Sequence, residues 1–441
     1  MASERNILLI TFDDAVAFWK YKRVFGQALQ TPNLDRICAQ STAFHAAYTQ
    51  APVCSPSRHS FLSGLTPHQT GLTMPRKDVF DHIDPAEFIP TRLKDAGYYS
   101  SSGGKGIAGF LPLQDADHAR IYSDEPKTFR KDWKVPPAIS REYGGFRGGK
   151  ATIDERHDRR FYDFQASKSA ISFFRRYRRD QPFFREVGFY GPHGPWITPA
   201  RFKDMYDEDG FKPPRAWDAG LPTNPYLDRH FDPNFDGPKP GVWEKSVRNY
   251  FSALTHVDHH LGRVWHALKA SRHADTTLVI ITSDHGHHLG DRKRFRKHTL
   301  YEQVANVPLI IHDPEHPVPQ VVADPVGLID IAPTIMDFAG LPALPGRVGH
   351  SLRPQMQLDR APDRAIPTVL RDNAAIRKGR YRFIQYEDGS TQFFDLGTDW
   401  WQAHDLGPDH PDYAEMAQAH ADTCRTYGFD PSTVTPVAEV A

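Results

Sequence analysis

The sequence has few cysteines, no long apolar run and no excess of charge of either sign. Its 441 residues include 54 Lys and Arg against 54 Asp and Glu, which gives a formal net charge of zero. A balanced charge argues against a nucleic-acid-binding or membrane-surface protein, because phosphate contacts require a basic excess. The apolar runs are far shorter than the ~20 residues of a membrane span. We therefore expect neither a nucleic-acid partner nor a membrane partner.

The cysteine content restricts the cellular setting. Cys38, Cys54 and Cys424 are the only three cysteines, and an odd, widely spaced set builds neither a disulfide framework nor a zinc-ligand pattern. The first fifteen residues contain one short apolar stretch followed at once by Asp13 and Asp14, which is not the pattern of a signal peptide. These features predict a cytoplasmic protein with reduced thiols. If a leader had been removed, the protein would instead be periplasmic or secreted.

Histidine, in contrast, is abundant. The chain contains 23 histidines, more than packing requires. Balanced charge together with surplus histidine indicates that the chemistry depends on a local site and not on the overall field of the protein.

Short apolar strands alternate with amphipathic helices through residues 1–365. We expect strands at residues 6–12, 98–102, 183–189, 276–282 and 307–311, and helices at residues 31–37, 91–96, 161–179, 247–268 and 325–339. This alternation predicts an α/β fold with a large, doubly wound, mainly parallel sheet flanked by helices. Residues 192–240 contain ten prolines and are expected to form a long surface excursion, the kind of segment that builds lids and substrate walls.

The pattern changes near residue 367. Short strands are expected at residues 375–378, 381–386 and 391–395, joined by Lys-Gly and Asp-Gly turns, and a final helix at residues 413–427. Residues 366–441 are therefore predicted to form a small antiparallel α+β subdomain that packs on the large domain.

Two acidic clusters follow predicted strands of the large sheet. Asp13 and Asp14 come after the first strand, and Asp284 and His285 come after the strand at residues 276–282. Ligands of doubly wound sheets bind beyond the carboxyl ends of the strands. Adjacent carboxylates repel unless they are solvated or bridged by a cation, and hard oxygen ligands suit Ca²⁺ or Mg²⁺. The alternative is that each cluster only caps a turn or a helix.

A third segment places Cys54 just before a predicted helix. The orphan amides and the dipole of a helix start favour negative charge at such a position. Pro56 fits the first helical turn, and Arg58 could hold an anion or orient Cys54. The alternative is a small buried cysteine at a helix start.

This Cys-x-Pro-x-Arg segment, followed by Ser63 and Gly64, resembles the signature of the type I sulfatases of the alkaline-phosphatase-like superfamily. In that family a formylglycine-generating enzyme oxidises the cysteine to formylglycine, whose hydrated aldehyde is the nucleophile. Further segments resemble the family in order, at residues 6–14, 104–105, 191–193, 283–286, 296–302, 379–383 and 394–396. The heparan- and iduronate-type sulfatases are the branches that the chain resembles most.

The resemblance implies a role for each matching residue. A divalent cation, usually calcium, would be bound by Asp13, Asp14, residue 54, Asp284 and His285. His285 could instead present a neutral nitrogen near the ion or the sulfate, because imidazole is a poorer calcium ligand than oxygen. The sulfate and the diol oxygen would be neutralised by Arg58 and Lys105. The leaving oxygen would be faced by His193 and Lys297, one of which donates a proton.

One family feature is missing from the sequence. The family has a histidine two or three residues after the lysine of its Gly-Lys segment, whereas Lys105 is followed by Gly106, Ile107 and Ala108. His59 is a possible substitute as the base of the elimination step, but we interpret it as an exposed helix residue. The alternatives are a slow enzyme, a different base, or a substrate class that needs another layout.

Several other basic residues are assigned more ordinary roles. The helical histidines at positions 256, 259 and 260 are interpreted as a partly buried helix face and not as a metal stripe. His287 and His288 are expected to line the pocket. The basic run at residues 175–179 is interpreted as a solvated helix end.

The sequence thus predicts a sulfatase that hydrolyses a sulfate ester, with a sulfated sugar as a candidate substrate. Two alternatives remain open. The first is a phosphonate monoester hydrolase or phosphodiesterase on the same scaffold, and the second is a catalytically silent binder of sulfated glycans.

Overall fold

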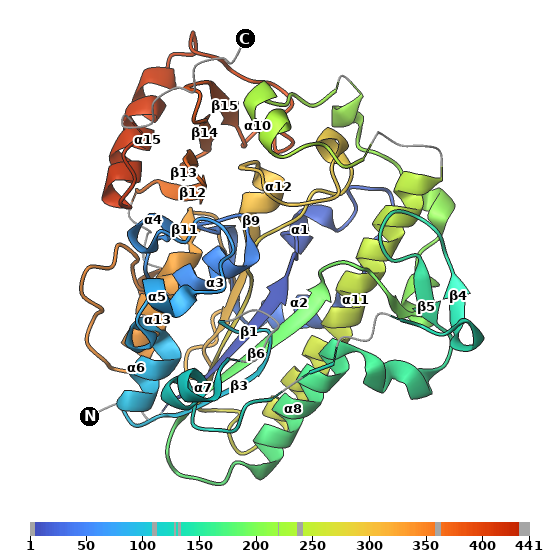
Figure 1. The fold of residues 1–441 in the computed structure, drawn as a ribbon, viewed down its shortest axis with the longest axis vertical. Coiled ribbons are helices and arrows are strands. Elements are labelled where there is room, and N and C mark those ends of the chain that lie inside the picture. Colours follow the sequence, from blue (N-terminus) through green and yellow to red (C-terminus); the bar gives the residue numbers. More distant parts are fainter. Residues whose placement is uncertain are drawn as a thin grey trace.

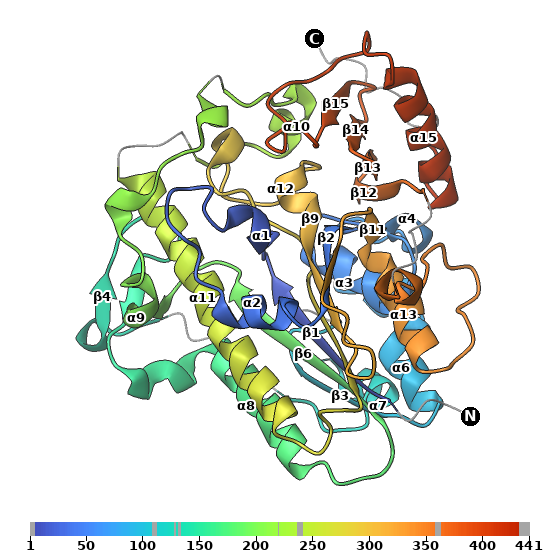
Figure 2. The same cartoon turned by 180° about the vertical axis from the view of Figure 1, so that it is seen from behind.

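A central β-sheet with helices on both faces organises most of the molecule (Figure 1, Figure 2). The computed structural model describes residues 5–107, 113–127, 129–130, 134–218, 220–235, 241–357 and 363–431. The predictions for Ala108 and for residues 432–441 lie outside these residues.

The large sheet has eight strands within the described residues, in the order β10-β2-β9-β8-β1-β6-β3, with β11 paired to β2. The strands are β1 (Asn6–Asp13), β2 (Thr42–Tyr48), β3 (Tyr99–Gly104), β6 (Phe183–Pro192), β8 (Thr277–Ser283), β9 (Asn306–His312), β10 (Gln320–Val322) and β11 (Val326–Gly327). Only β9 pairs antiparallel to its neighbours among these strands. The predicted mainly parallel, doubly wound sheet is therefore confirmed.

Each face of the sheet is covered by its own set of helices. The described α-helices are α1 (Phe18–Tyr21), α2 (Pro32–Cys38), α3 (Cys54–Ser63), α4 (Pro67–Thr70), α5 (Val79–His82), α6 (Ile89–Asp95), α7 (Asp115–Ile121), α8 (Tyr162–Arg176), α9 (Ala200–Lys203), α10 (Pro225–His230), α11 (Val242–Lys269), α12 (Glu302–Ala305), α13 (Ile331–Phe338), α14 (Arg353–Met356) and α15 (Tyr413–Thr426).

The alternation of side chains along β1 explains why the sheet is buried on both sides. Leu8 and Ile10 pack into the cluster formed with α2, α8 and α11, whereas Ile7 and Leu9 pack into the cluster formed with α3, α6 and α13. Successive residues of a strand point to opposite faces, so an uninterrupted apolar strand fits a sheet with helices on both faces.

A second sheet follows at Ile366. Its strands β12 (Ile366–Leu370), β13 (Asn373–Lys378), β14 (Tyr381–Gln385) and β15 (Thr391–Asp395) pair antiparallel in sequence order, and α15 packs against this sheet. The predicted small antiparallel α+β unit is present, and its division from the large domain at residue 365 stays a prediction. A third sheet joins β4 (Ser140–Glu142), β5 (Lys150–Thr152) and β7 (Thr198–Pro199).

The structure corrects some of the expected elements. The segment expected as a helix at residues 325–339 begins with β11 and a 3-10 turn, Leu328–Asp330, and only then becomes α13. The Asp330 carboxylate accepts the Gly327 amide, and Pro333 lies in the first turn of α13, where a missing N–H costs nothing. Strand β2 was not expected. Part of the excursion at residues 192–240 is regular, and its helix α10 packs on the second sheet.

Among the described residues, none of the helices has both the length and the apolarity to cross a membrane.

Candidate active site

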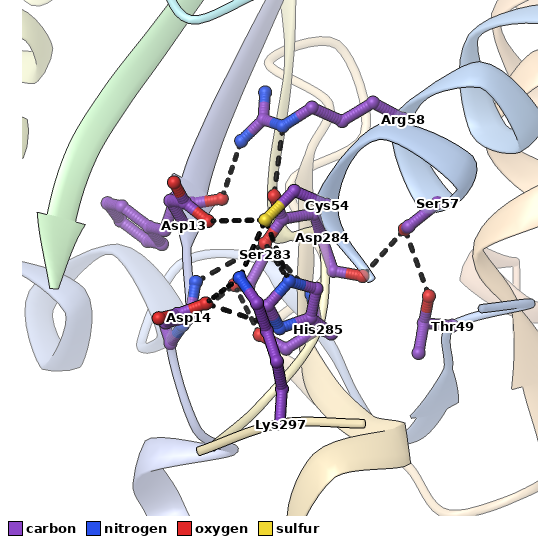
Figure 3. Close-up of polar contacts among 12 residues, drawn as sticks. Asp13, Asp14, Thr49, Cys54, Ser57, Arg58, Ser283, Asp284, His285 and Lys297 are labelled. Carbon is purple, nitrogen blue, oxygen red and sulfur yellow. Dashed lines mark hydrogen bonds and ion pairs between the residues drawn. The ribbon is translucent and has the colours of Figure 1, made fainter. Parts of the chain in front are cut away.

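The predicted site residues converge at the carboxyl ends of β1 and β8 and at the start of α3 (Figure 3). Parallel strands β1 and β8 are neighbours in the sheet, which brings the two acidic clusters together. Cys54 is the first residue of α3, and no side chain caps that helix start. Residue 54 therefore lies at a helix N-terminus that faces two acidic strand ends.

Four predicted ligands surround one point. The Cys54 Sγ lies 3.4 Å from the Asp13 Oδ1 and 3.3 Å from the His285 Nε2. One ligand atom each from Asp13, Asp14, Cys54 and His285 lies within 4.8 Å of the others. Two carboxylates with an imidazole and the side chain of residue 54 form a donor set that fits a divalent cation.

Asp284, the fifth predicted ligand, joins the parts of this group. Its Oδ1 accepts the backbone amides of Asp14, at 3.3 Å, and His285, at 3.0 Å. Its Oδ2 accepts the Arg58 Nε at 2.9 Å and lies 3.5 Å from the Lys105 Nζ. Asp284 thus fixes the backbone of two other ligands, and its own ligation of the cation stays a prediction.

Arg58 is completely buried beside this group. Besides Asp284, its guanidinium donates to the Thr11 Oγ1, the Lys105 carbonyl and the Phe12 carbonyl, each at 2.9 Å. These bonds use four of the five N–H groups of an arginine. Through these hydrogen bonds Arg58 holds Asp284 and the ends of β1 and β3 in place. A contact between Arg58 and sulfate stays a prediction.

Two lysines, the buried Lys105 and the partly buried Lys297, complete the charge balance of the site. Lys105 donates to the Asp13 Oδ2 at 2.6 Å, and Lys297 donates to the Asp14 Oδ1 at 2.9 Å and lies 2.7 Å from the Cys54 Sγ. Burial alone would lower the pKa of each lysine, but the nearby carboxylates and Cys54 raise both pKa values above the ordinary range. Both lysines are therefore cationic and face residue 54 and its acidic neighbours.

The unmodified thiol is not an activated nucleophile. Burial, reinforced by the charge of Asp13, raises the pKa of Cys54 to about 12, against the opposing effects of Lys105 and Lys297. Because the thiolate and not the thiol is the nucleophile, Cys54 in its encoded form is chemically quiet at neutral pH.

His285 presents a lone pair to residue 54. Its Nδ1 lies 2.9 Å from the Gly286 carbonyl, and a carbonyl only accepts, so Nδ1 carries the proton. The neutral ring then has its lone pair on Nε2, the atom next to Cys54. Burial lowers the pKa of His285 and keeps the ring neutral. This tautomer suits either of the two roles considered for His285, metal ligand or neutral acceptor.

His193 lies in the loop after β6. Its Nδ1 lies 2.6 Å from the Gly194 carbonyl and 2.8 Å from the Tyr190 hydroxyl, and because a carbonyl only accepts, Nδ1 is a donor. Burial raises the pKa of Asp14, but Lys297 and, next in size, His193 lower it, and the pKa lies well below its ordinary value. His193 thus lies within electrostatic reach of the acidic cluster, as a group facing the leaving oxygen must.

Two buried residues of the long helices support the site and were not found from the sequence. Asp163 of α8 accepts the backbone amides of Tyr190, at 2.6 Å, and Gly191, at 3.0 Å, and so holds the loop of His193. Tyr250 of α11 donates to the Asp14 carbonyl at 2.7 Å. Asp14 has a left-handed φ of 66°, which this hydrogen bond helps to fix. No local sequence signal marks either residue, because both contacts join distant parts of the chain.

The interpretation of His59 as an exposed residue is wrong. His59 is 3% exposed, and its Nε2 donates to the Ile107 carbonyl at 3.1 Å. Burial lowers the pKa of His59 to about 4, so the ring is neutral. His59 therefore anchors the segment after Lys105, from which the family histidine is missing.

Other histidines lie in three different settings. The Nε2 of His287 lies 4.0 Å from the Asp14 Oδ2, at the edge of the site as expected. His288 bonds Asp291 and Thr299, so it belongs to a buried network and not to the pocket wall. His256 and His260 are buried on α11, with their Nε2 atoms 3.1 Å apart, which agrees with a packed helix face.

Comparison with known proteins identifies the family of the chain. The family model described as Sulfatase matches residues 5–341. A curated sulfatase of Formosa agariphila is 31% identical over 417 residues, covering 89% of this chain and 81% of the relative. The chain belongs to the sulfatase family and is a sulfuric ester hydrolase.

Further relatives and solved structures are similar to the chain. Mouse iduronate 2-sulfatase is 26% identical over 420 residues, covering 80% of this chain and 74% of the relative. The solved phosphonate monoester hydrolase of Agrobacterium radiobacter matches with a TM-score of 0.74 and 20% identity, over 96% of this chain and 95% of its own. A structure described in complex with its substrate D-glucosamine-2-N,6-O-disulfate matches with a TM-score of 0.70 and 20% identity, over 96% and 98% of the two chains. These structural matches show the shared fold.

Proposed function

We propose that this sulfatase hydrolyses a sulfate ester of a sulfated sugar, with residue 54 acting as formylglycine after oxidation of Cys54. The observation that carries the proposal is the convergence on one side chain. Asp13, His285 and Lys297 all contact the Cys54 Sγ at 3.4 Å or less. A thiol that stays protonated in this position is not a nucleophile. An oxygen nucleophile at residue 54 would have both proton acceptors and cationic groups around it.

The proposed cation is Ca²⁺, held by Asp13, Asp14, Asp284, His285 and the oxygen of modified residue 54. The carboxylate-rich donor set supports a hard cation. When bound, the ion would polarise the sulfate group and lower the pKa of the hydrated aldehyde. The same carboxylates are bonded by Lys105 and Lys297, so both ammonium groups lie beside the residues that would hold the ion.

The protein side chains then have separate tasks. Arg58 holds Asp284 and the Lys105 backbone. Lys105 and Lys297 neutralise the sulfate oxygens as charge develops on them. His193, with its proton-bearing Nδ1 fixed by Gly194, turns its Nε2 to the leaving oxygen, and either protonated His193 or Lys297 donates the proton as the ester bond breaks. The one lone pair of His285 is directed at residue 54, so His285 accepts the proton in place of the missing histidine only if it does not ligate the cation.

The substrate class rests on the relatives. Iduronate 2-sulfatase is named for a sulfated uronic acid, and a structural neighbour is described with a disulfated glucosamine as its substrate. These names support a sulfated sugar for this chain.

The test is sulfate release by protein coexpressed with a formylglycine-generating enzyme. We expect hydrolysis of 4-nitrophenyl sulfate that is lost in the Cys54→Ala variant and after removal of divalent cations. A parallel assay with the phenylphosphonate monoester of 4-nitrophenol distinguishes the alternative reaction. A large preference for the phosphonate ester would reject the proposal, and binding of sulfated sugars without turnover would favour the silent binder.

A further inference from the structure

A strongly basic region surrounds helix α8, although the protein as a whole has no net charge. Two grooves flank this helix. The β3 groove, of about 910 Å³, lies between α8 and the start of β3, and the α11 groove, of about 1050 Å³, lies between α8 and α11. Figure 1 shows α8 and α11 lying side by side on one face of the sheet.

Cationic side chains dominate both grooves. The β3 groove is lined by six of them, Lys127, Lys168, Arg176, Arg178, Arg179 and Arg185. The α11 groove is lined by five, Lys168, Arg175, Arg178, Arg263 and Arg272. Among the described residues that line the grooves, Asp124 is the single carboxylate. The region therefore carries a large local excess of positive charge.

A helix dipole does not account for this excess. One or two cations in the last turn satisfy a helix C-terminus, and Arg175 and Arg176 already supply them. Lys168 lies two turns earlier, and Arg185 and Arg263 belong to β6 and α11. The arginines at residues 175–179 are exposed, as expected of a solvated helix end, and the further cations come from other parts of the structure.

Most of these cations are not neutralised within the protein. Lys127 forms an ion pair with Asp124, Arg185 lies 3.7 Å from the same carboxylate, and Arg272 lies 3.6 Å from Asp180. Five exposed cations form no ion pair with another described residue: Lys168, Arg175, Arg176, Arg178 and Arg179. Neighbouring like charges repel one another, and an anionic ligand would relieve this repulsion.

The β3 groove also offers ring surfaces. Tyr99, Phe173 and Tyr177 line it, and Arg179 lies 4.7 Å from the centre of the Tyr99 ring. A site that combines aromatic faces with several cations matches a ligand that alternates apolar ring faces with anionic groups. A chain of sulfated sugar rings has this character.

The same helix connects the grooves to the active site. Asp163, in the first turn of α8, holds the backbone of the His193 loop. Gln165 and Lys168 line the β3 groove, so this groove begins one turn from Asp163 and continues past the end of the helix. The fourteen residues from Asp163 to Arg176 span about 20 Å at 1.5 Å per residue, a distance that a short oligosaccharide bridges.

We propose that the grooves along α8 form an exosite for a sulfated oligosaccharide chain, which holds the polymer while one of its sulfate esters occupies the active site. This inference rests on the proposed sulfatase activity toward sulfated sugars and adds that the natural substrate is polymeric and carries several sulfate groups.

Two triple variants test the exosite by binding. In the first, Lys168, Arg176 and Arg179 are replaced by alanine. In the matched control, the exposed residues Arg23, Lys212 and Arg215, which line neither groove, are replaced by alanine. Binding of fluorescent dextran sulfate is measured in a Cys54→Ala background, with uncharged dextran as a blank. We expect the first triple to weaken binding by about tenfold to a hundredfold and to flatten its salt dependence, while the control leaves both unchanged.

The outcomes separate the exosite from the activity. Turnover of 4-nitrophenyl sulfate should be the same in both triples, because a small ester does not reach the grooves. Dextran-sulfate affinity unchanged in the first triple would overturn the exosite. Tighter binding of duplex DNA or of phosphatidylserine vesicles than of dextran sulfate, lost in the same triple, would overturn the assignment of the ligand. Absence of sulfate release from any ester would contradict the proposed function, whatever the binding result.

Discussion

Replacement of Arg58 should destabilise the protein more than any exposed change, because its guanidinium is buried and bonded on all sides. In Arg58→Met the side chain keeps most of its volume, but Asp284, which is 0% exposed, loses its nearer ion-pair partner and keeps only Lys105, at 3.5 Å. Breaking a buried ion pair by removing one partner costs about 3–5 kcal/mol. The carbonyls of Phe12 and Lys105 and the Thr11 hydroxyl also lose a donor. We expect a loss of at least about 3 kcal/mol, a large part of the ~5–15 kcal/mol of a typical domain.

The measurement is the urea midpoint of unfolding in EDTA, followed by circular dichroism. The matched variant is Arg58→Met combined with Asp284→Asn, which removes both charges and should recover a large part of the loss. Addition of Ca²⁺ should stabilise Arg58→Met more than the wild type, because a cation near Asp284 replaces the missing charge. A loss below about 1 kcal/mol in the single variant, or no recovery in the double variant, would refute the argued role of Arg58 as the anchor of Asp284.

Three further predictions concern the site. Lys297→Ala should reduce kcat of the matured enzyme by about 10²–10³-fold, as expected for loss of one group that stabilises transition-state charge. The control is Lys293→Ala, an exposed residue of the same loop, which should leave kcat unchanged. Equal effects of the two substitutions would contradict the role assigned to Lys297. Unmodified protein, whose donor set includes a thiol and an imidazole, should bind Zn²⁺ at least about tenfold more tightly than a Cys54→Ser variant in calorimetric titrations, and equal affinities would show that Cys54 is not in the metal group. In Asp163→Asn the side chain has one acceptor oxygen, so it can accept from only one of the backbone amides of Tyr190 and Gly191, and its NH₂ group faces the other. The resulting misplacement of His193 should lower kcat by about tenfold or more while the KM changes little. A changed KM with unchanged kcat would contradict this positioning role.

The sequence predicts the site better than it predicts its supports. Asp13 and Asp284 could be found because each closely follows a run of apolar and β-branched residues, and the carboxyl ends of such strands meet at one edge of a parallel sheet. Cys54 could be found because Pro56 and Arg58 mark the helix start. Asp163, in contrast, looks like an ordinary first-turn acid of an amphipathic helix, and its contact with the His193 loop exists only after α8 packs on the sheet.

His59 shows why local polarity misleads at such a site. Helix α3 contains serine, arginine and histidine with no apolar stripe, so its sequence suggests exposure. In the structure most of the helix is buried, because its polar side chains hold the backbones around the nucleophile. His59 bonds the Ile107 carbonyl, and Ser57 bonds the Asp284 carbonyl at 2.6 Å. A buried helix of this kind is determined by long-range partners that no periodicity reveals.

The central claim is that Cys54 is the precursor of the catalytic group, and the mass of the peptide that contains it tests this claim most directly. Protein coexpressed with a formylglycine-generating enzyme is digested, and the Cys54 peptide is compared with that of protein made without the enzyme. The account predicts the mass decrease of thiol-to-aldehyde conversion, in proportion to sulfatase activity across preparations. An unchanged thiol at residue 54 in a preparation that still releases sulfate would contradict the account.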